Sequence, residues 1–226
     1  MWVLGIETAG NVGGVALWRE GEVPYELRFP ARMRHAELLA PAVEGLFAQS
    51  RVKKRDLGLI AVDIGPGSFT GVRIGISFAK ALAQSLGIPL VGVRQSEALG
   101  IPVGSWCPRV AVLIHDRRDL VYFCWAEGAK AGKEETLSLS QAIGRIPPRQ
   151  RICVVGSGAV RFRERIEKAT PGVYILGEPW AHPLPGVVAQ LGLERYRSGE
   201  SGDPKELEPN YVQPPLAKEG HYGKGL

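Results

Sequence analysis

Residues 59–75 read LIAVDIGPGSFTGVRIG. The first six, residues 59–64, are mostly apolar and β-prone, which is typical of a strand buried in a parallel sheet. The turn at residues 65–67 ends the strand, because its two glycines adopt backbone conformations closed to other residues and the proline between them fixes its own φ. Ser68 or Thr70 can then cap a helix. The stretch therefore predicts a buried strand, a sharp turn and a long helix.

The predicted helix carries small residues at a spacing of four: Gly71, Gly75, Ala79 and Ala83. Residues four apart lie on one face of a helix, so another backbone can come close to this stripe. A glycine costs about 1 kcal/mol relative to alanine inside a helix, so the two glycines need a packing reason. The stripe is expected to pack either on the sheet of its own chain or on a partner chain.

The loop lacks the common phosphate-binding and nucleophile motifs. A P-loop needs a second glycine five residues after the first, and neither Gly65 nor Gly67 has one. The dinucleotide pattern G-x-G-x-x-G fails at Thr70, and the nucleophile pattern G-x-S-x-G fails at Pro66 and Thr70. We therefore interpret Ser68 as a helix cap rather than a nucleophile.

The turn and the first turns of the helix resemble a family signature. The matching residues are Gly65, Pro66, Gly67, Ser68, Phe69, Thr70, Gly71, Val72, Arg73, Ile74 and Gly75. This run is similar to the signature of the TsaB (formerly YeaZ) family, bacterial proteins needed to make threonylcarbamoyladenosine in tRNA. The resemblance spans most of residues 1–126 and returns at residues 209–212, whereas residues 127–205 match no motif of the family.

The order of elements in the first half resembles the half-domain of the actin, sugar-kinase and Hsp70 superfamily (ASKHA). The expected βββαβαβ elements lie at residues 2–9, 12–18, 23–29, 33–50, 59–64, 71–86 and 89–93. We therefore expect an α/β, two-domain actin-like fold with a mixed five-stranded sheet in the first domain.

A boundary is expected at residues 100–108, where Gly, Pro and Ser interrupt the periodicity. The first domain then covers residues 1–104, and a second, degenerate actin-like domain covers residues 105–226. The second domain is expected to contain strands at 110–114, 121–126 and 151–155, helices at 140–146 and 185–197, and a glycine turn at 156–158 that opens a helix to 168. The tail after Gly199 is expected to be loosely ordered, apart from residues 209–213, and to pack back on the first domain.

Composition bounds the class of protein. The chain has 226 residues, 45% of them hydrophobic, which is enough for a substantial core. It contains no run of about 18 apolar residues and no basic leader with a cleavage site, so neither a membrane span nor secretion is expected. Three well-separated cysteines without a C-x-x-C pair fit a reduced cytoplasm: Cys107, Cys124 and Cys153.

No metal site is expected, because the four histidines are scattered and form no H-x-x-x-H pair: His35, His115, His182 and His221. The formal net charge is +5. The densest basic cluster is RVKKR at residues 51–55. Two interpretations stay open for it: cations that complement the dipole of a helix end, or a contact to nucleic acid.

The resemblance implies a scaffold or activating subunit that has lost catalysis and dimerises with a catalytic paralogue, TsaD, which carries the metal and nucleotide chemistry. It implies no activity of the chain alone, no cofactor, a homodimer when alone, a TsaE-like ATPase as a further partner and tRNA reached through the complex. In the family, two helices of the first domain pack against the equivalent pair of the partner. On this chain that interface maps to Leu38, Ala42, Leu46, Gly71, Gly75, Ala79 and Ala83.

Active members of the superfamily hold ATP between the two halves, with carboxylates for the metal and backbone N–H groups at the phosphates. The corresponding residues here are Glu7, Thr8, Asp116, Gly156 and Gly158. The turn at residues 115–119 has no glycine, and the family usually has Asp at positions 7 and 115, Glu at 120 and Arg at 213. We therefore expect a degenerate nucleotide cleft.

Two other functional classes stay open. One is an active ATP-dependent transferase or kinase of the same superfamily, which tight nucleotide binding by the isolated chain would favour. The other is a peptidase, because relatives of the fold were once labelled glycoproteases. For that class the chain offers His35 beside Glu37, which we interpret as a solvated helix start rather than a catalytic pair.

Overall fold

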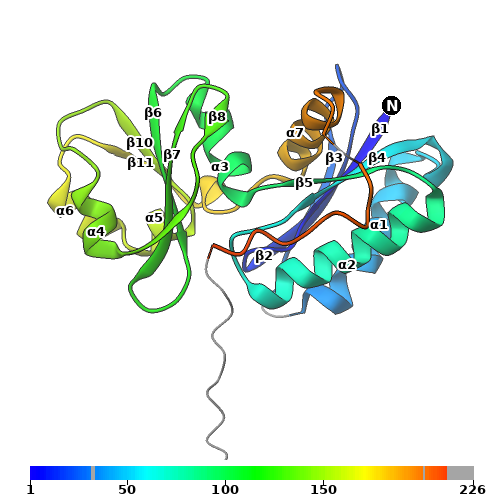
Figure 1. Ribbon diagram of the computed structural model, residues 1–226, viewed down its shortest axis with the longest axis horizontal. Helices are drawn as coiled ribbons and strands as arrows, with labels where there is room; N and C mark the ends of the chain where they lie inside the picture. The colour runs from blue at the N-terminus through cyan, green and yellow to red at the C-terminus, as the bar shows by residue number, and fades with distance from the viewer. Residues whose placement is uncertain (32–33, 201, 213–226) are drawn as a thin grey trace, which may run out of the picture.

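Two α/β units lie side by side in the computed structural model of the chain, which describes residues 1–31, 34–200 and 202–212 (Figure 1). Each unit is built around its own sheet. Met33, Gln213 and the tail that follows, for which the sequence made predictions, lie outside the described ranges. Within those ranges, no helix combines the length and the apolar character needed to cross a bilayer.

The first unit contains the mixed five-stranded sheet that the sequence predicts. Its strands are β1 (Trp2–Glu7), β2 (Val12–Trp18), β3 (Tyr25–Pro30), β4 (Leu57–Asp63) and β5 (Leu90–Val93). They lie in the order β3-β2-β1-β4-β5, with β1 antiparallel to β2 and parallel to β4, and β4 parallel to β5. Because parallel strands end at the same edge of a sheet, the loops after β1 and β4 meet there.

Three helices cover the two faces of this sheet, α1 and α2 on one and α7 on the other (Figure 1). They are α1 (His35–Ser50), α2 (Phe69–Leu86) and α7 (Pro185–Arg197). Successive side chains of β1 point to opposite faces, so Leu4 and Ile6 enter the core under α1 and α2 while Val3 enters the core under α7. Gly5 lets the backbone of α7 approach, because a Cβ there would collide with the carbonyl oxygen of Pro185.

Helix α7 corrects the predicted domain assignment, which placed all of residues 105–226 in the second domain. The helix packs on β1, β2 and β4 of the first sheet. Its buried Val188 and Ala189 complete the core on that face together with residues of β4 and β5. The helical pattern at 185–197 predicts a helix correctly, but periodicity does not tell which sheet the helix covers.

The second unit has a six-stranded sheet in the order β11-β10-β6-β7-β8, with β9 paired to β7. Its strands are β6 (Arg109–His115), β7 (Leu120–Glu127), β8 (Lys130–Ala131), β9 (Glu135–Ser138), β10 (Ile152–Val155) and β11 (Tyr174–Ile175). Its short helices are α4 (Leu139–Gly144), α5 (Ser157–Arg161) and α6 (Arg163–Ala169). Two short 3₁₀ helices are also present: η1 (Lys54–Asp56) precedes β4 in the first unit, and η2 (Glu178–Trp180) follows β11. The predicted hairpin of β6 and β7 is present.

The boundary predicted at residues 100–108 overlaps a helix, α3 (Gln95–Gly104), which lies between the two sheets. Ala98 packs in the core under α7, and Leu99 packs in the core of the second sheet. The glycine at position 100 looks like a helix breaker in the sequence. In the structure Gly100 is buried where a Cβ would meet a side chain of β7, so close packing explains it.

The small-residue stripe of α2 faces the sheet of its own chain. Gly71 and Gly75 lie against the segment that leaves β1, because a Cβ on Gly71 would meet the carbonyl oxygen of Thr8 and one on Gly75 would meet the Thr8 Oγ1 atom. Ala79 and Ala83 are buried in the same core. The prediction that these four residues form a partner interface is therefore wrong, since a buried stripe has no surface left for another chain.

The remaining predicted interface residues lie on helix α1, where one is buried and two are partly exposed. Leu46 is buried in the core with α2, so its assignment to a partner interface is also wrong. Leu38 and Ala42 are partly exposed on the side of α1 that reaches solvent. Their role in a partner contact stays a prediction.

Replacing Gly75 by alanine should destabilise the chain by about 2 kcal/mol or more, because the new Cβ overlaps the buried Thr8 side chain. The matched control is Gly45→Ala on α1, whose Cβ would lie 3.8 Å from the Leu27 Cδ1 atom, an ordinary contact. That variant should gain up to about 1 kcal/mol from helix propensity. Urea unfolding followed by circular dichroism measures both. Equal midpoints for the two variants would contradict the packing assigned to Gly75.

Candidate functional site

A cavity of about 740 Å³ opens between the two units, at the edge where β1 and β4 end. Its first wall comes from loops of the first unit and its second wall from the β6–β7 turn and α5. The lining residues lie within 9–11, 64–72, 114–117, 157–161, 178–182 and 210–212, with Gln95 and Tyr122 in addition. Of the five residues predicted for a nucleotide cleft, Asp116 lines this cavity, whereas Glu7, Thr8, Gly156 and Gly158 lie behind its walls.

The carboxyl group of Glu7 is held by its own loop. Its Oε1 atom accepts hydrogen bonds from the backbone N–H groups of Ala9, at 2.9 Å, and Gly10, at 3.2 Å. The side chain is buried, with 1% of the residue exposed. Two N–H groups of the turn that could face a phosphate therefore point to this carboxylate instead.

Glu7 also neighbours a second buried carboxyl group, that of Asp63 at the end of β4. Burial raises the pKa of Glu7, and burial together with the charge of Glu7 raises the pKa of Asp63 well above its ordinary value. Oδ1 of Asp63 accepts the N–H of Gly65 at 2.7 Å, which leaves Oδ2 beside the Glu7 carboxyl. Ionising both adjacent buried carboxyl groups is costly, so the raised pKa values favour a state in which the pair holds one proton. Sequence analysis did not identify Asp63, because nothing in the pattern shows which strand ends are neighbours.

Backbone N–H groups of the second wall also form hydrogen bonds within the protein. The N–H of His115 donates to Oγ of Ser157 at 3.0 Å, and the N–H of Asp116 donates to the carbonyl of Leu120 at 3.0 Å. The N–H of Gly156 donates to the carbonyl of Trp180 at 2.9 Å.

The predicted glycine turn at 156–158 packs against β6, because a Cβ on either glycine would press on the carbonyl oxygen of Leu113. Charge at the cavity comes from Arg117 and Arg161, opposed by Asp116 and Glu178. The Arg117 guanidinium lies 3.7 Å from the Asp116 carboxylate.

The signature loop joins α2 to the loop after β1. Ser68 caps α2, as predicted, since its Oγ accepts the N–H of Gly71 at 3.2 Å, and its own N–H donates to the carbonyl of Ala9 at 2.7 Å. Gly67 allows this contact, because a Cβ there would collide with the Ala9 carbonyl oxygen. Gly65 has φ +94°, a conformation that favours glycine. Most of the signature is thus explained by close backbone packing around Ala9.

Two residues of the signature point outward and meet the C-terminal segment. The Arg73 guanidinium lies 3.8 Å above the ring of Phe69, and its Nε donates to Oη of Tyr211 at 2.8 Å. The rings of Phe69 and Tyr211 stack with centroids 5.6 Å apart. The segment at residues 209–212 therefore forms part of the cavity wall. Its motif was visible in the sequence, but its contact with Arg73, 138 residues away, was not.

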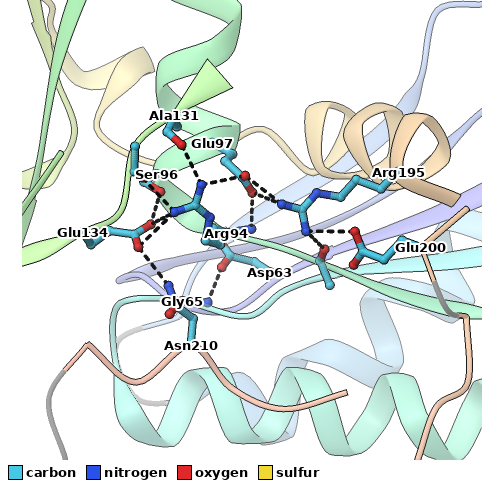
Figure 2. A network of polar contacts seen from close by, with 12 residues as sticks. Asp63, Gly65, Arg94, Ser96, Glu97, Ala131, Glu134, Arg195, Glu200 and Asn210 are labelled. Carbon is cyan, nitrogen blue, oxygen red and sulfur yellow. Dashed lines mark hydrogen bonds and ion pairs between the residues drawn. The ribbon is translucent and has the colours of Figure 1, made fainter. Parts of the chain in front are cut away.

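Behind the cavity, four charged side chains form a buried network at the junction of the two units (Figure 2). Nη2 of Arg195 donates to both Glu97 carboxylate oxygens at 2.7 Å, and Nη2 of Arg94 donates to Glu97 Oε1 at 2.8 Å. Nη1 of Arg94 donates to both oxygens of Glu134 at 3.2 Å. Burial raises the pKa of Glu97, but the hydrogen bonds and charges of the two arginines outweigh it and hold that pKa below its ordinary value.

The same network reaches the C-terminal segment. Nδ2 of Asn210 donates to Oε2 of Glu134 at 3.2 Å (Figure 2). The Asn210 N–H donates to the carbonyl of Ile64 at 2.8 Å. Ser96 on α3 donates to the other Glu134 oxygen. Loops from both units, α3, α7 and residues 209–212 are thereby held together. Nothing in the sequence pattern indicated this network, because helix α3, which carries Glu97, was not predicted.

His35 corrects a further expectation, because it is buried rather than solvated. Its Nε2 lies 2.9 Å from the carbonyl oxygen of Gly10. Glu37, on the exposed side of the same helix, pairs with Arg34. In the described parts of the chain, no three His, Cys, Asp or Glu side chains converge as a metal site would require.

A family model described as "TsaD: tRNA N6-adenosine threonylcarbamoyltransferase" matches residues 29–146, just over half of the chain. The "tRNA threonylcarbamoyladenosine biosynthesis protein TsaB" of Bacillus subtilis is 29% identical over 220 residues, 94% of each chain. The protein of the same name from Escherichia coli is 37% identical over 131 residues, 56% of this chain and 54% of its own.

A solved structure titled "YeaZ from Pseudomonas aeruginosa" superimposes with a TM-score of 0.75 and 25% identity, covering 92% of this chain and all of the other. The predicted α/β, two-domain actin-like fold is confirmed.

Asp63→Asn should flatten the pH dependence of stability. Because the folded-state pKa of Asp63 is raised, the folded chain keeps a proton that the unfolded chain releases above its ordinary pKa of 3.8. The wild type should therefore lose stability as pH rises above that value, until the folded-state pKa is passed. The asparagine variant, which can still hydrogen-bond to Glu7 without ionising, should lose less. Thermal unfolding from pH 4 to 8 measures this, with exposed Glu44→Gln as the control; parallel curves for wild type and Asp63→Asn would refute the shared proton.

Glu97→Gln should destabilise the chain by about 3 kcal/mol, because two arginines at a largely buried site lose their shared negative charge. Glu135→Gln is the matched control. Its carboxylate pairs with Arg145 at the surface, with side chains 56% and 40% exposed, so its urea midpoint should stay close to that of the wild type. If the two variants unfold at the same urea concentration, the network does not stabilise the junction.

Proposed function

The chain belongs to the TsaB branch of the tRNA N6-adenosine threonylcarbamoyltransferase family, and we propose that it is a non-catalytic scaffold and activating subunit in the synthesis of threonylcarbamoyladenosine in tRNA. Its relatives are named for that pathway, and the similarity to the Bacillus subtilis protein covers 94% of both chains. The family signature at residues 65–75 lies inside the region that the family model matches.

The observation that carries the non-catalytic part of the proposal is the internal use of polar groups at the cleft. The Glu7 carboxyl accepts two N–H groups of its own loop through Oε1, and it neighbours the buried Asp63 carboxyl. Ser157 receives the N–H of His115 on the opposite wall. A fold that binds ATP elsewhere in its superfamily here uses these groups for its own stability, which supports a binding subunit over a catalyst.

The partner surface we propose is the outer face of α1 and α2, rather than the buried stripe. Leu38 and Ala42 on α1 and Phe78 on α2 are partly exposed, and Ala81 on α2 is exposed. The two helices pack side by side on one face of the sheet (Figure 1), and we infer that these residues form an apolar strip on the outer side of the pair. Such a strip suits helix-to-helix packing against the equivalent pair of a TsaD-like subunit, or of a second copy of this chain when alone.

Further partners follow from the same proposal. A TsaE-like ATPase joins the assembly of this chain with its TsaD-like partner, and tRNA is bound by the assembly. No nucleotide cofactor is assigned to the chain itself.

Titration calorimetry tests this function directly. Titration with the TsaD protein from the same source should give a heat of binding, whereas titration with ATP and magnesium should give no heat of binding. Reconstituted threonylcarbamoyladenosine synthesis should also depend on adding the chain. ATP binding at micromolar concentration without TsaD binding would overturn the proposal in favour of an ATP-dependent enzyme.

Ala81→Glu should weaken association with the TsaD-like partner at least tenfold, because it places a charge in the centre of an apolar contact. Ala169→Glu, at an exposed alanine of α6 in the second unit, is the matched control and should bind as the wild type does. Calorimetric titration of each variant measures the affinity, and its melting temperature shows that it is folded. Loss of binding by both variants, or by neither, would rule out this face.

A further inference from the structure

The loop between α1 and β4 presents four cations in five residues. They are Arg51, Lys53, Lys54 and Arg55, and all four are exposed. We name this group the α1–β4 basic cluster. Within the described residues, none of the four forms an ion pair, although most arginines of the second unit, such as Arg163, have an acidic partner.

The backbone that carries the α1–β4 basic cluster is held in place. Val52, between the cations, packs against the core under α1 and α2. The N–H of Lys53 donates to the Asp56 carboxylate at 3.1 Å, and the N–H of Asp56 returns a bond to the Lys53 carbonyl at 2.8 Å. The four cations thus project from a fixed loop, which lowers the entropy lost when they bind a common ligand.

Helix-end electrostatics do not explain the cluster. The last turn of α1 contains no basic residue, and only Arg51, at its C-cap, is close enough to complement the helix dipole. The other three cations follow on η1 and its flank. The nearest acid, Asp56, is already used to cap the backbone of Lys53. The four positive charges are therefore left for an external anion with several charges.

We propose that the α1–β4 basic cluster binds the phosphate backbone of RNA. Closely spaced, unpaired lysines and arginines match a chain of phosphates, and such contacts position an RNA without reading its sequence. That the RNA is the tRNA substrate of the assembly rests on the proposed function. The cluster directly follows α1, whose outer face is proposed to hold the TsaD-like partner, so an RNA held by that partner lies within reach of it.

The test compares two variants with the same loss of charge. The first is the quadruple variant Arg51→Gln, Lys53→Gln, Lys54→Gln and Arg55→Gln. The control replaces four exposed cations of the second unit that form no described ion pair: Lys130→Gln, Lys133→Gln, Arg151→Gln and Lys168→Gln. Melting temperatures confirm that both fold. Fluorescence anisotropy then measures binding of an unmodified tRNA transcript to the isolated chain and to its mixture with the TsaD protein, across a range of salt.

The cluster variant should bind the tRNA at least tenfold more weakly at low salt, and the slope of log affinity against log salt should fall by about three. The control should change much less. Equal losses in the two variants would show a net-charge effect only, and unchanged binding by the cluster variant would also overturn the inference. Calorimetry with TsaD in the same samples separates the two proposals: intact TsaD binding with unchanged tRNA binding refutes the RNA site alone, whereas absent TsaD binding by the wild type refutes the proposed function.

Discussion

The carboxylate of Glu97, shared by Arg94 and Arg195, is the interaction on which the arrangement of the two units depends. Arg94 follows β5 in the first unit and also binds Glu134 of the second, while Arg195 belongs to the helix that returns to the first sheet. An ion network at a largely buried site tolerates little movement, because each charge that loses its partner stays poorly solvated. These side chains therefore help to hold the two units together, alongside α3, which packs Ala98 in the core under α7 and Leu99 in the core of the second sheet.

Close backbone packing at the end of β1 is the second constraint on the structure. Gly67 and Gly71 bring the signature loop against the carbonyls of Ala9 and Thr8, and the turn after β1 then satisfies the Glu7 carboxylate with its own N–H groups. Groups that could meet a ligand are thus used for folding. The surfaces proposed for binding are accordingly the outer face of α1 and α2 and the cations that follow α1.

Local elements were predicted well where one feature of the chain decides them. The strand, turn and helix at residues 59–86, the Ser68 cap and the helix at 185–197 follow from periodicity and turn chemistry, whereas the five-stranded sheet followed from the resemblance of the element order to the actin-like superfamily. Errors arose where a residue's role depends on its neighbour in space. The glycine stripe of α2 has the same spacing whether it meets its own sheet or a partner, and Gly100 looks like a breaker until the side chain that it accommodates is known.

The sequence alone determined the order of strands and helices over residues 2–93, the family signature and the position of the basic cluster, because these depend on residues close together in the chain. Only the tertiary structure decided the pairing of Glu7 with Asp63, the junction around Glu97, and the contact of Arg73 with Tyr211. These contacts join residues far apart in sequence, and hydrophobic periodicity carries no information about which polar side chains meet. Burial makes the loss of one partner costly, whereas the same charged pairs at the surface would be solvated and would contribute little to stability.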